Sequence, residues 1–563
     1  MTASASTPSR AAVIPAIPLH RRLYGFGSIY GKTIRDSRLA FIIAAGLLGG
    51  MALVMGVAVS NIFPSPQARL EVDKLVGSMP ASMVNLFGNA TAMGAKLGTL
   101  GGYMTFKYGA IFAIGTALWS IFALSATLAG EARRGSLDIV AAAPFGKRRI
   151  ALEKVAAHVT MLSLAMMVLA IGTTVSSTVF GNASQGDTIP PLSSAGFALW
   201  TGSIALFFGG LAFALSPLLG RAGSAAIAGL SMAVLWLTSG LDVGGPLVAV
   251  SPFHWTVNHI ALVGMYDWLP VALVGATGVI LLVIGVELFV RRDLGVTAGL
   301  SLPGLPTVLL GVHGPVSRAM GEQLPRALSW GIGIGLIGAL YASLVGPMAT
   351  QLGHDSSLVV TMGALFPNVD LASTGGWMQL YAELLYIAAG FGAATFVSKW
   401  ASEEGDGQLE MVLTTPTTRV GWTVAGGIAA ILAVAGMTVL FALGVGLGAS
   451  SGGVPAGDAI LGSASLGLYA AAVVGIGVAV GGLWRTSLAG EIAALFVVAT
   501  YLLDLVAPPL KLPDWVHQLA LTAHMGRPMV GEWDPVGIVL CLAIFAGGVA
   551  IGAWGIRRRD IGR

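Results

Sequence analysis

Two stretches of the chain share one pattern: EARRGSLDIVAAAP at residues 131–144 and EEGDGQLEMVLTTP at residues 403–416. Each keeps Glu, Gly, Leu, an acidic residue, Val and Pro in the same register, so corresponding residues lie 272 positions apart. Lys147 and Arg419 extend the match at the same distance. A fixed distance maintained over such a segment indicates an internal repeat.

The repeated stretch has the features of a short helix. In the first copy, Gly135 can cap the helix start, and Asp138 places a carboxylate in the first turn, where the helix dipole favours it. Pro144 ends the helix after about two turns, because the residue before a proline avoids the α region. Such a helix leaves Leu137 exposed and is marginal in water, so we expect a partner surface to cover it. A tight loop on the membrane surface is the alternative.

Composition places most of the chain in a membrane. Of 563 residues, 55% are hydrophobic and 10% charged, and 79 are glycines. A soluble core cannot bury so much apolar surface, whereas a bilayer accepts it. The single cysteine excludes an internal disulfide and a thiolate metal cluster. The net charge of +4 is too small to suggest a nucleic-acid partner.

Windows of about 20 residues, the length that crosses the hydrocarbon core, give twelve candidate spans and predict an all-α polytopic membrane protein. Several spans are rich in glycine, which favours close helix packing in a membrane. The predicted spans are 39–60, 108–129, 151–180, 193–219, 223–240, 270–290, 327–348, 379–398, 420–447, 459–483, 487–505 and 535–556.

The distribution of Lys and Arg predicts the orientation. If both termini lie on one side, that side holds all but six of the 30 Lys and Arg residues. By the positive-inside rule, both termini are then expected in the cytoplasm. The six on the other side are Arg69, Lys74, Lys96, Lys107, Lys511 and Arg527.

A second repeated motif lies at the end of each half of the chain. RRDLG begins at Arg291 and RRDIG at Arg558, 267 positions later. Together with the first repeat, this predicts two copies of a six-span unit, and an even number of spans makes the repeat parallel. The predicted organisation is a disordered cytoplasmic lead at 1–20, a first transmembrane domain at 21–295, a cytoplasmic linker at 296–316 and a second transmembrane domain at 317–563.

These motifs resemble those of ATP-binding-cassette exporter permeases. The Glu-x-x-x-Gly-x-Leu-acid pattern between spans two and three is similar to the coupling-helix region of that family, and RRDLG and SPFHW (251–255) are also similar. The double-length form resembles the permease subunit of actinobacterial tetronasin and polyketide antibiotic exporters. The resemblance implies a short coupling helix, a cytoplasmic amphipathic connecting helix and a re-entrant 5–6 loop in each half.

By this resemblance, HRRLYGFGSIYGKTIRDS (20–37) and SRAMGEQLPRA (317–327) are the connecting helices, and phospholipid anchoring is a compatible interpretation. The resemblance also implies that each repeated stretch docks on one of two copies of a cytoplasmic ATPase. The second copy carries fewer basic residues, which argues against equal coupling by the two halves. The implied coupling residues are Glu131, Gly135, Leu137, Asp138, Pro144, Glu403, Gly407, Leu409, Glu410 and Pro416.

No phosphate-binding loop motif occurs; the nearest text, APFGKR at 143–148, lacks the first glycine and the hydroxyl residue. No metal-binding or paired-carboxylate motif occurs either, so we expect a transport subunit without catalytic residues, metal or cofactor of its own. ATP and Mg²⁺ are expected on the partner ATPase.

Glu491 and Glu383 lie within predicted spans, where carboxylates often mark a pathway. Glu491 is also close enough to Arg485 to pair with it. Glu287 is expected to pair with Arg291 or Arg292, one turn away. Aromatic residues of the spans are candidates for lining a substrate path, although packing is their commoner role: Tyr108, Trp119, Phe122, Tyr386, Phe391, Phe496 and Tyr501.

The sequence therefore predicts the permease subunit of an ATP-driven exporter in a bacterial plasma membrane, expelling amphipathic or hydrophobic small molecules such as antibiotics. The alternative is a proton-coupled secondary multidrug transporter, with Glu491 and Glu383 as proton carriers. That alternative explains twelve spans in a parallel repeat equally well. It gives no reason for two matched helices after the second span of each half.

Overall fold

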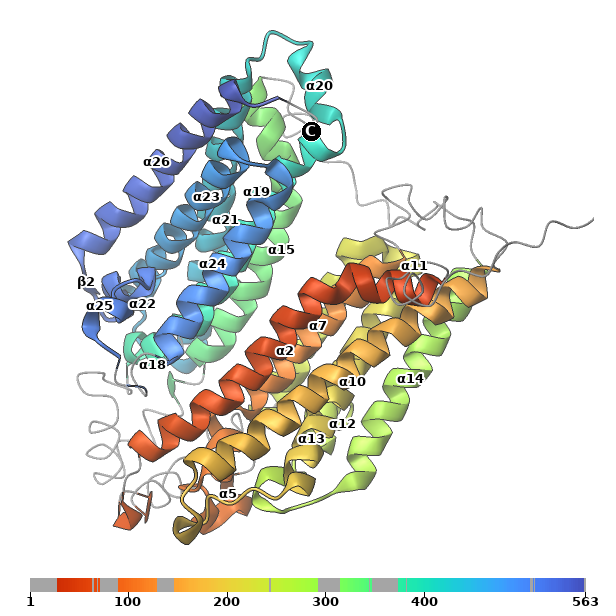
Figure 1. Cartoon of the computed structure of the whole chain (residues 1–563). Coiled ribbons are helices and arrows are strands. Elements are labelled where there is room, and N and C mark those ends of the chain that lie inside the picture. Colours follow the sequence, from red (N-terminus) through yellow and green to blue (C-terminus); the bar gives the residue numbers. More distant parts are fainter. Residues whose placement is uncertain are drawn as a thin grey trace, which may run out of the picture. The chain divides into compact units, whose positions relative to one another are not determined.

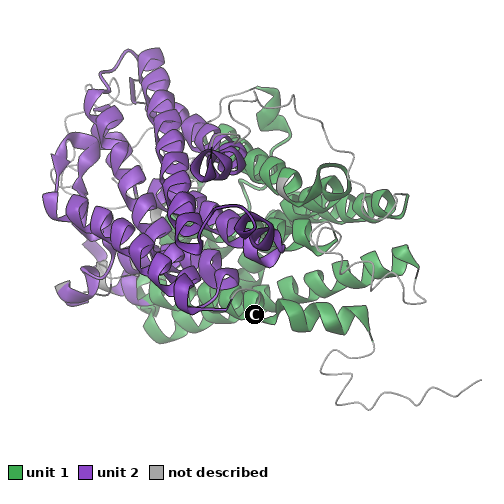
Figure 2. Ribbon diagram, turned by 90° about the horizontal axis from the view of Figure 1, so that it is seen from above, with its two compact units in different colours: residues 1–56, 85–300 green, residues 57–84, 301–563 purple. Residues whose placement is uncertain are grey.

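The fold was described from a computed structural model of the chain. The structure describes residues 28–62, 65–67, 69–70, 90–128, 146–241, 245–291, 314–343, 345–346, 373–380, 382–506, 510 and 512–560. It divides into two compact units, shown in different colours in Figure 2. Unit 1 comprises residues 1–56 and 85–300, and unit 2 comprises residues 57–84 and 301–563.

Unit 1 is built from long apolar helices. Helix α7 packs along α11, which in turn packs against α14 and α10. Gly220 breaks α11 at a positive φ of 70°, which separates two spans within one helical element. The elements are α2 (Ile29–Ile62), α5 (Ala90–Met93), η1 (Gly94–Lys96), α6 (Leu100–Tyr103), η2 (Met104–Tyr108), α7 (Gly109–Thr127), α10 (Lys147–Phe180), η3 (Ala183–Gln185), α11 (Pro191–Leu241), α12 (Pro246–Ala249), α13 (Pro252–Trp255), η4 (Ala261–Val263) and α14 (Trp268–Val290).

Unit 2 has the same kind of architecture, with a small two-stranded hairpin at one end. Its closest helix pairs are α15 with α21, α23 with α26, and α19 with α24. Figure 1 shows α20 at one end of this bundle and α18, α22 and α25 at the other. The elements are α15 (Pro315–Ser343), α18 (Thr374–Leu380), α19 (Ala382–Gly405), α20 (Gln408–Leu413), α21 (Arg419–Gly452), α22 (Gly457–Gly462), α23 (Ala464–Leu483), α24 (Thr486–Val506), α25 (Asp514–His517), η6 (Leu521–His524), β1 (Gly526–Arg527), η7 (Pro528–Val530), β2 (Glu532–Trp533) and α26 (Pro535–Arg558).

Twelve helices of the described residues are long and apolar enough to cross a membrane, which confirms the predicted fold class and span count. The two proposed connecting helices differ from the prediction. Residues 317–327 form the first turns of α15 rather than a separate helix, and the described part of 20–37 is continuous with α2. Pro325 lies inside α15. A proline removes one backbone hydrogen bond and kinks a helix without having to end it.

The spacing of equivalent helices follows the sequence repeat. The third span of each unit, α10 and α21, has 34 residues, and their first residues, Lys147 and Arg419, are 272 positions apart. The sixth spans, α14 and α26, begin at Trp268 and Pro535, 267 positions apart.

Glycines bring the first and third spans together in both units. A Cβ on Gly172 of α10 would lie 3.0 Å from the carbonyl oxygen of Gly49 in α2. In unit 2, a Cβ on Gly444 of α21, 272 residues after Gly172, would lie 2.0 Å from the carbonyl oxygen of Gly335 in α15. Only glycine permits this close backbone approach, which is how membrane helices gain van der Waals contact.

We expect Gly444→Ala to lower the free energy of unfolding of unit 2 by about 1–3 kcal/mol, because the added methyl group forces α21 away from α15. Gly436→Ala, on the same helix with nothing within 4 Å of the new Cβ, should raise it by about 0.5–1 kcal/mol through helix propensity. Unfolding of the purified variants in mixed detergent micelles measures both. Equal effects at the two positions would contradict the proposed contact.

Candidate functional site

The second repeated stretch forms a helical corner between α19 and α21. Helix α19 ends at Gly405, and Gly407 takes a left-handed conformation (φ 72°) that turns the chain into α20. Glu410 lies in the first turn of α20, where the unpaired backbone amides and the helix dipole stabilise its negative charge. Helix α20 ends at Leu413, three residues before the exposed Pro416.

Helix α20 has one buried and one exposed face. Leu409 is buried against the bundle, whereas Glu410 is exposed and Met411 is 66% exposed. An isolated helix of six residues is not stable in water. Its position therefore depends on contacts of the flanking residues with the bundle.

Glu403 provides the first of those contacts. Its carboxylate is buried and accepts hydrogen bonds from the guanidinium of Arg318 in α15 and from Trp422 Nε1 in α21, the latter at 2.8 Å. One buried carboxylate thus joins the end of α19 to the starts of two other spans. Since an unpaired buried charge is costly, this contact fixes the corner in place.

The ion pair extends into a larger charged network on α15 and α19. Arg318 also donates to Glu322 Oε1 at 3.0 Å, and Lys399 of α19 pairs with Glu322. Arg318 therefore lies between two carboxylates, and Glu322 lies between two cations. Alternating charges of this kind stabilise one another when they are partly shielded from water.

Two stacked indoles lie beside the network. Trp400 and Trp422 have ring centroids 4.7 Å apart and an interplanar angle of 26°. A Cβ on Gly426 would lie 2.2 Å from Trp400, so glycine makes room for the indole. Trp422 links this stack to the network, because its Nε1 donates to Glu403.

The first repeated stretch, with Glu131, Gly135, Leu137, Asp138 and Pro144, lies outside the described residues. The chain beyond it is described from Gly146. There, Arg149 pairs with Glu153 at 2.8 Å, and Glu153 accepts from the amides of Ile29 and Tyr30 at 3.0 and 3.1 Å. A carboxylate at this position stabilises the N-terminus of α2.

Glu287 pairs with a residue of another helix; of its two predicted partners, Arg292 lies outside the described residues. Its carboxylate lies 2.6 Å from Arg148 of α10. Helix α14 ends at Val290, and Arg291 is its C-cap residue. Arg148 of α10 is therefore the partner that the structure gives to Glu287.

The aromatic candidates are distributed between core and surface. Tyr386 and Tyr108 are buried, and Tyr386 donates to Ser465 Oγ at 2.9 Å. Phe122 is 52% exposed. The partly buried ones are Trp119, Phe391, Phe496 and Tyr501. A substrate path along these residues stays a prediction.

Glu491 is exposed on α24. Neither Arg485 nor any other described residue forms a hydrogen bond or ion pair with it. It shares a face with Ser487 and Leu495, each four residues away, and Leu495 is 54% exposed. For Glu383, the side chain lies outside the described part of the chain.

Two buried polar groups within spans were missed by sequence reasoning. In unit 1, Lys154 and His158 are buried on one face of α10, and His158 Nε2 lies 2.9 Å from Ser120 Oγ of α7. In unit 2, Asp504 is buried at the end of α24, where Thr522 donates to it and His517 lies 3.4 Å away. The spacing of four between Lys154 and His158 was the available signal.

The 5–6 loop of unit 1 contains short helices α12 and α13, where short helices were expected. His259 of this loop is buried against Trp268, with ring centroids 4.9 Å apart. Burial lowers the pKa of His259 below its ordinary value, although hydrogen bonding to the carbonyls of Gly196 and Asp267 acts in the opposite direction. The lowered pKa favours the neutral ring, in which Nδ1 accepts from the amide of Asp267 at 3.1 Å.

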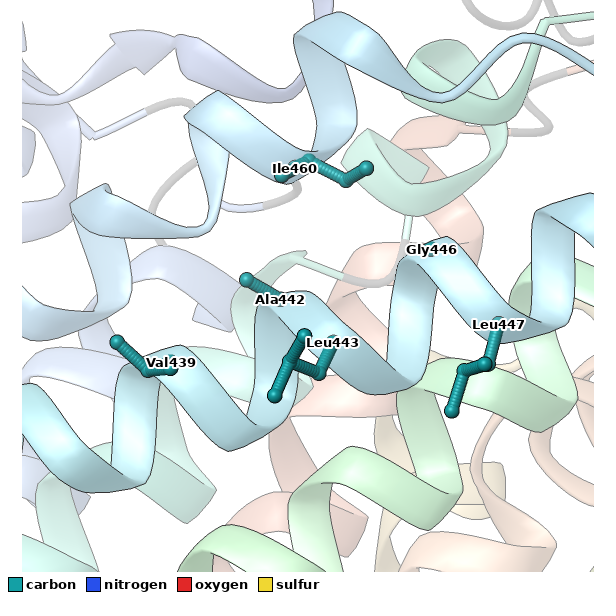
Figure 3. Close-up of a pocket in the computed structure, with 6 residues that line it drawn as sticks. All are labelled: Val439, Ala442, Leu443, Gly446, Leu447 and Ile460. Carbon is teal, nitrogen blue, oxygen red and sulfur yellow. The ribbon is translucent and has the colours of Figure 1, made fainter.

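One shallow apolar groove of about 310 Å³ lies between α21 and α22 (Figure 3). It has no polar side chain to orient a ligand, which distinguishes it from an ordinary binding pocket. Lipid chains are the natural occupants of such a surface on a membrane protein. Its lining residues are Val439, Ala442, Leu443, Gly446, Leu447 and Ile460.

The family that matches this chain covers part of its C-terminal half. Residues 312–557 match a family described as the C-terminal domain of the multidrug efflux system permease Rv1217c. The Rv1217c permease of Mycobacterium tuberculosis (strain ATCC 25618 / H37Rv) is 28% identical over 338 residues, or 57% of this chain and 58% of the relative. The chain is homologous to a multidrug efflux permease. This homology covers part of each protein, and the resemblance to tetronasin exporters stays a prediction.

We expect Glu403→Gln to lower the free energy of unfolding by about 3 kcal/mol, because it leaves Arg318 without its buried counter-charge. Arg318 is itself partly exposed, which keeps the loss at the lower end for a buried pair. Glu410→Gln changes the same charge seven residues away on the exposed face and should change stability by no more than about 0.5 kcal/mol. Denaturant titration of the detergent-solubilised variants decides; indistinguishable values would mean that the buried pair does not anchor the corner.

Proposed function

We propose that this chain is the transmembrane permease of an ATP-driven exporter that expels amphipathic or hydrophobic small molecules. Separate cytoplasmic ATPase subunits supply the energy. The observation that carries the proposal is α20, a helix held outside the spans by buried ion pairs and exposing Glu410 and Met411.

The anchoring of α20 supports a mechanical role. A loop that only joins two spans needs no buried carboxylates, since burying a charge costs free energy unless its partners are well placed. Glu403 nevertheless connects α19 to α15 and α21. A force applied to the exposed face of α20 would therefore reach three spans through short, rigid contacts.

The homology supports the class of substrate. The relative is named a multidrug efflux system permease, and its C-terminal domain family covers nearly all of unit 2. We infer from this name that the substrates are small molecules that partition into a bilayer. Such molecules match the apolar character of the spans in this chain.

The fifth span of each unit leaves much of its surface uncovered by neighbouring helices, as the sixth span of unit 2 also does. Residues 223–240 and 486–504 are each 28% buried, whereas the fourth spans are 61% and 67% buried. The exposed face of α24 carries Glu491 next to Leu495. A carboxylate among apolar residues suits an amphipathic cation.

In this proposal, two ATPase copies bind at the α20 end of the permease, which the positive-inside rule assigns to the cytoplasm of a bacterial plasma membrane. ATP and Mg²⁺ are held by the ATPase. Closure of the ATPase dimer moves the coupling segments and converts an inward-open permease to an outward-open one. Such a cycle requires that ATP and substrate favour different conformers.

Purification of the chain from its native membrane in mild detergent should recover an ATPase at two copies per permease. Asp138→Lys together with Glu410→Lys should reduce recovery of the ATPase about tenfold or more. The two substitutions reverse the charge of the docking surface, so charges that attracted the ATPase would repel it. Quantitative mass spectrometry of the eluate measures the ratio. Asp458→Lys makes the same charge change at an exposed site at the other end of unit 2 and should leave recovery unchanged. If the wild-type chain recovers no ATPase, the proposal is wrong.

A proton-coupled transporter is distinguished by Glu491→Gln. In an ATP-driven exporter, this variant should retain transport within about threefold for uncharged substrates, because no proton has to pass through the carboxylate. Uptake of a neutral dye into inverted vesicles, with ATP supplied and the proton gradient abolished, provides the measurement. Loss of transport in the variant together with dependence on the gradient would favour the proton-driven mechanism.

A further inference from the structure

The two arginines of the closing RRDIG motif, Arg558 and Arg559, differ in environment. Arg558 is exposed and stacks on Trp554 with its guanidinium 4.1 Å from the ring centroid. Arg559, the next residue, has a side chain that is only 12% exposed. The chain leaves the helix at Arg559 in an extended conformation, which directs this side chain toward the bundle.

Arg559 pairs with a second buried glutamate of the α20 corner. Its guanidinium donates to Glu404, whose side chain is 6% exposed. Glu404 also accepts from Thr486 Oγ1 at 2.7 Å, at the start of α24. The carbonyl of Arg559 in turn accepts from Arg419 Nη1 at 3.0 Å, at the start of α21.

These contacts join the ends of four spans, α19, α21, α24 and α26. They are separate from the contacts of Glu403, which reach α15 and α21. The two adjacent glutamates therefore face different parts of the bundle. Figure 1 shows the end of α26 at the same end of the bundle as α20.

The sequence indicates that this second anchor belongs to one half only. At the 272-residue spacing, Glu403 corresponds to Glu131, but Glu404 corresponds to Ala132. Arg559 corresponds to Arg292 at the 267-residue spacing of the closing motifs. The first half thus retains the arginine of the pair in its sequence and lacks the carboxylate.

We propose that Arg559 is a positioning residue that clamps the α19–α20 corner to the last span, so that α24 and α26 move with α20. This inference rests on the proposed function of α20 as the coupling element. Without the clamp, α20 could rotate without moving α24 or α26.

The variant Arg559→Gln removes the buried charge and keeps a polar side chain of moderate size. Arg558→Gln is the matched control, because it makes the same change one residue earlier at an exposed site. The double variant Glu404→Arg with Arg559→Glu restores the pair with its charges exchanged. Thr486 can serve this exchanged pair, since a hydroxyl both donates and accepts.

Hydrogen exchange of the purified permease tests the clamp without any ATPase. Amides of residues 405–413 should exchange about tenfold faster in Arg559→Gln than in the wild-type chain, because the corner opens more often. Arg558→Gln should match the wild type, and the exchanged pair should regain most of the protection. Unchanged exchange in Arg559→Gln would overturn the clamp, whatever the energy source of transport.

Transport in proteoliposomes containing the ATPase tests the consequence of the clamp. The number of substrate molecules exported per ATP hydrolysed should fall at least about fivefold in Arg559→Gln, the lower range of an ordinary coupling free energy. ATP hydrolysis per complex should stay within about twofold, since the ATPase still docks on α20. The exchanged pair should recover at least half of the ratio.

The outcomes separate the two levels of the proposal. A parallel fall of transport and ATP hydrolysis, with no recovery in the exchanged pair, would show that Arg559 serves folding alone and would overturn its positioning role. If hydrogen exchange behaves as expected but the wild-type chain has no ATPase partner, the clamp stands and the proposed function fails.

Discussion

Close backbone contact between helices is the interaction on which unit 2 depends. Lipid tails are as apolar as leucine, so helices in a bilayer gain little by burying one another's side chains. The helices instead approach at glycines, as at Gly335 and Gly444, until backbone atoms touch. The same contact recurs in unit 1 between Gly49 and Gly172. Without it, α15 would not bring Arg318 within reach of Glu403.

The polar corner depends on this packing in turn. Charged side chains near the end of a membrane bundle are stable only if each has a partner in the correct place. The paired helices hold Arg318, Trp422 and Arg419 at fixed positions, and adjacent glutamates of α19 then have partners on opposite sides. The ion pairs of Glu403 and Glu404 thereby hold α20, which lies outside the spans, in a fixed position on the bundle.

The sequence predicts the spans well because their signal is local. Length and hydropathy are sufficient to place Gly223–Gly240 or Trp268–Val290, since a bilayer imposes the same requirement on every span. The start of α20 could also be predicted, because Gly407 and Glu410 are helix-start signals. Its end at Leu413, before Pro416, shows that such boundaries are less exact.

The partners of the charged residues could not be predicted in the same way. Glu403 and Arg318 are 85 residues apart, and Glu404 and Arg559 are 155 apart. Only tertiary packing brings such residues together. Glu287 is a further example, because its partner Arg148 lies on another helix. Asp504 was missed for the same reason, since its partners lie on the short helices α25 and η6.

The contact between α15 and α21 has a mechanical consequence of its own. Gly331, Gly335, Ala339 and Ser343 of α15 lie against Leu440, Gly444, Gly448 and Gly452 of α21, one turn apart on each helix. A slip of α21 by one turn, about 5.4 Å, toward the end of α15 would again place small residues opposite small residues. The reverse slip would press Leu440 against Ala327, which is larger than a glycine. Because small residues recur at each turn of this seam, a sliding movement of α21 along α15 would meet least resistance in steps of whole turns.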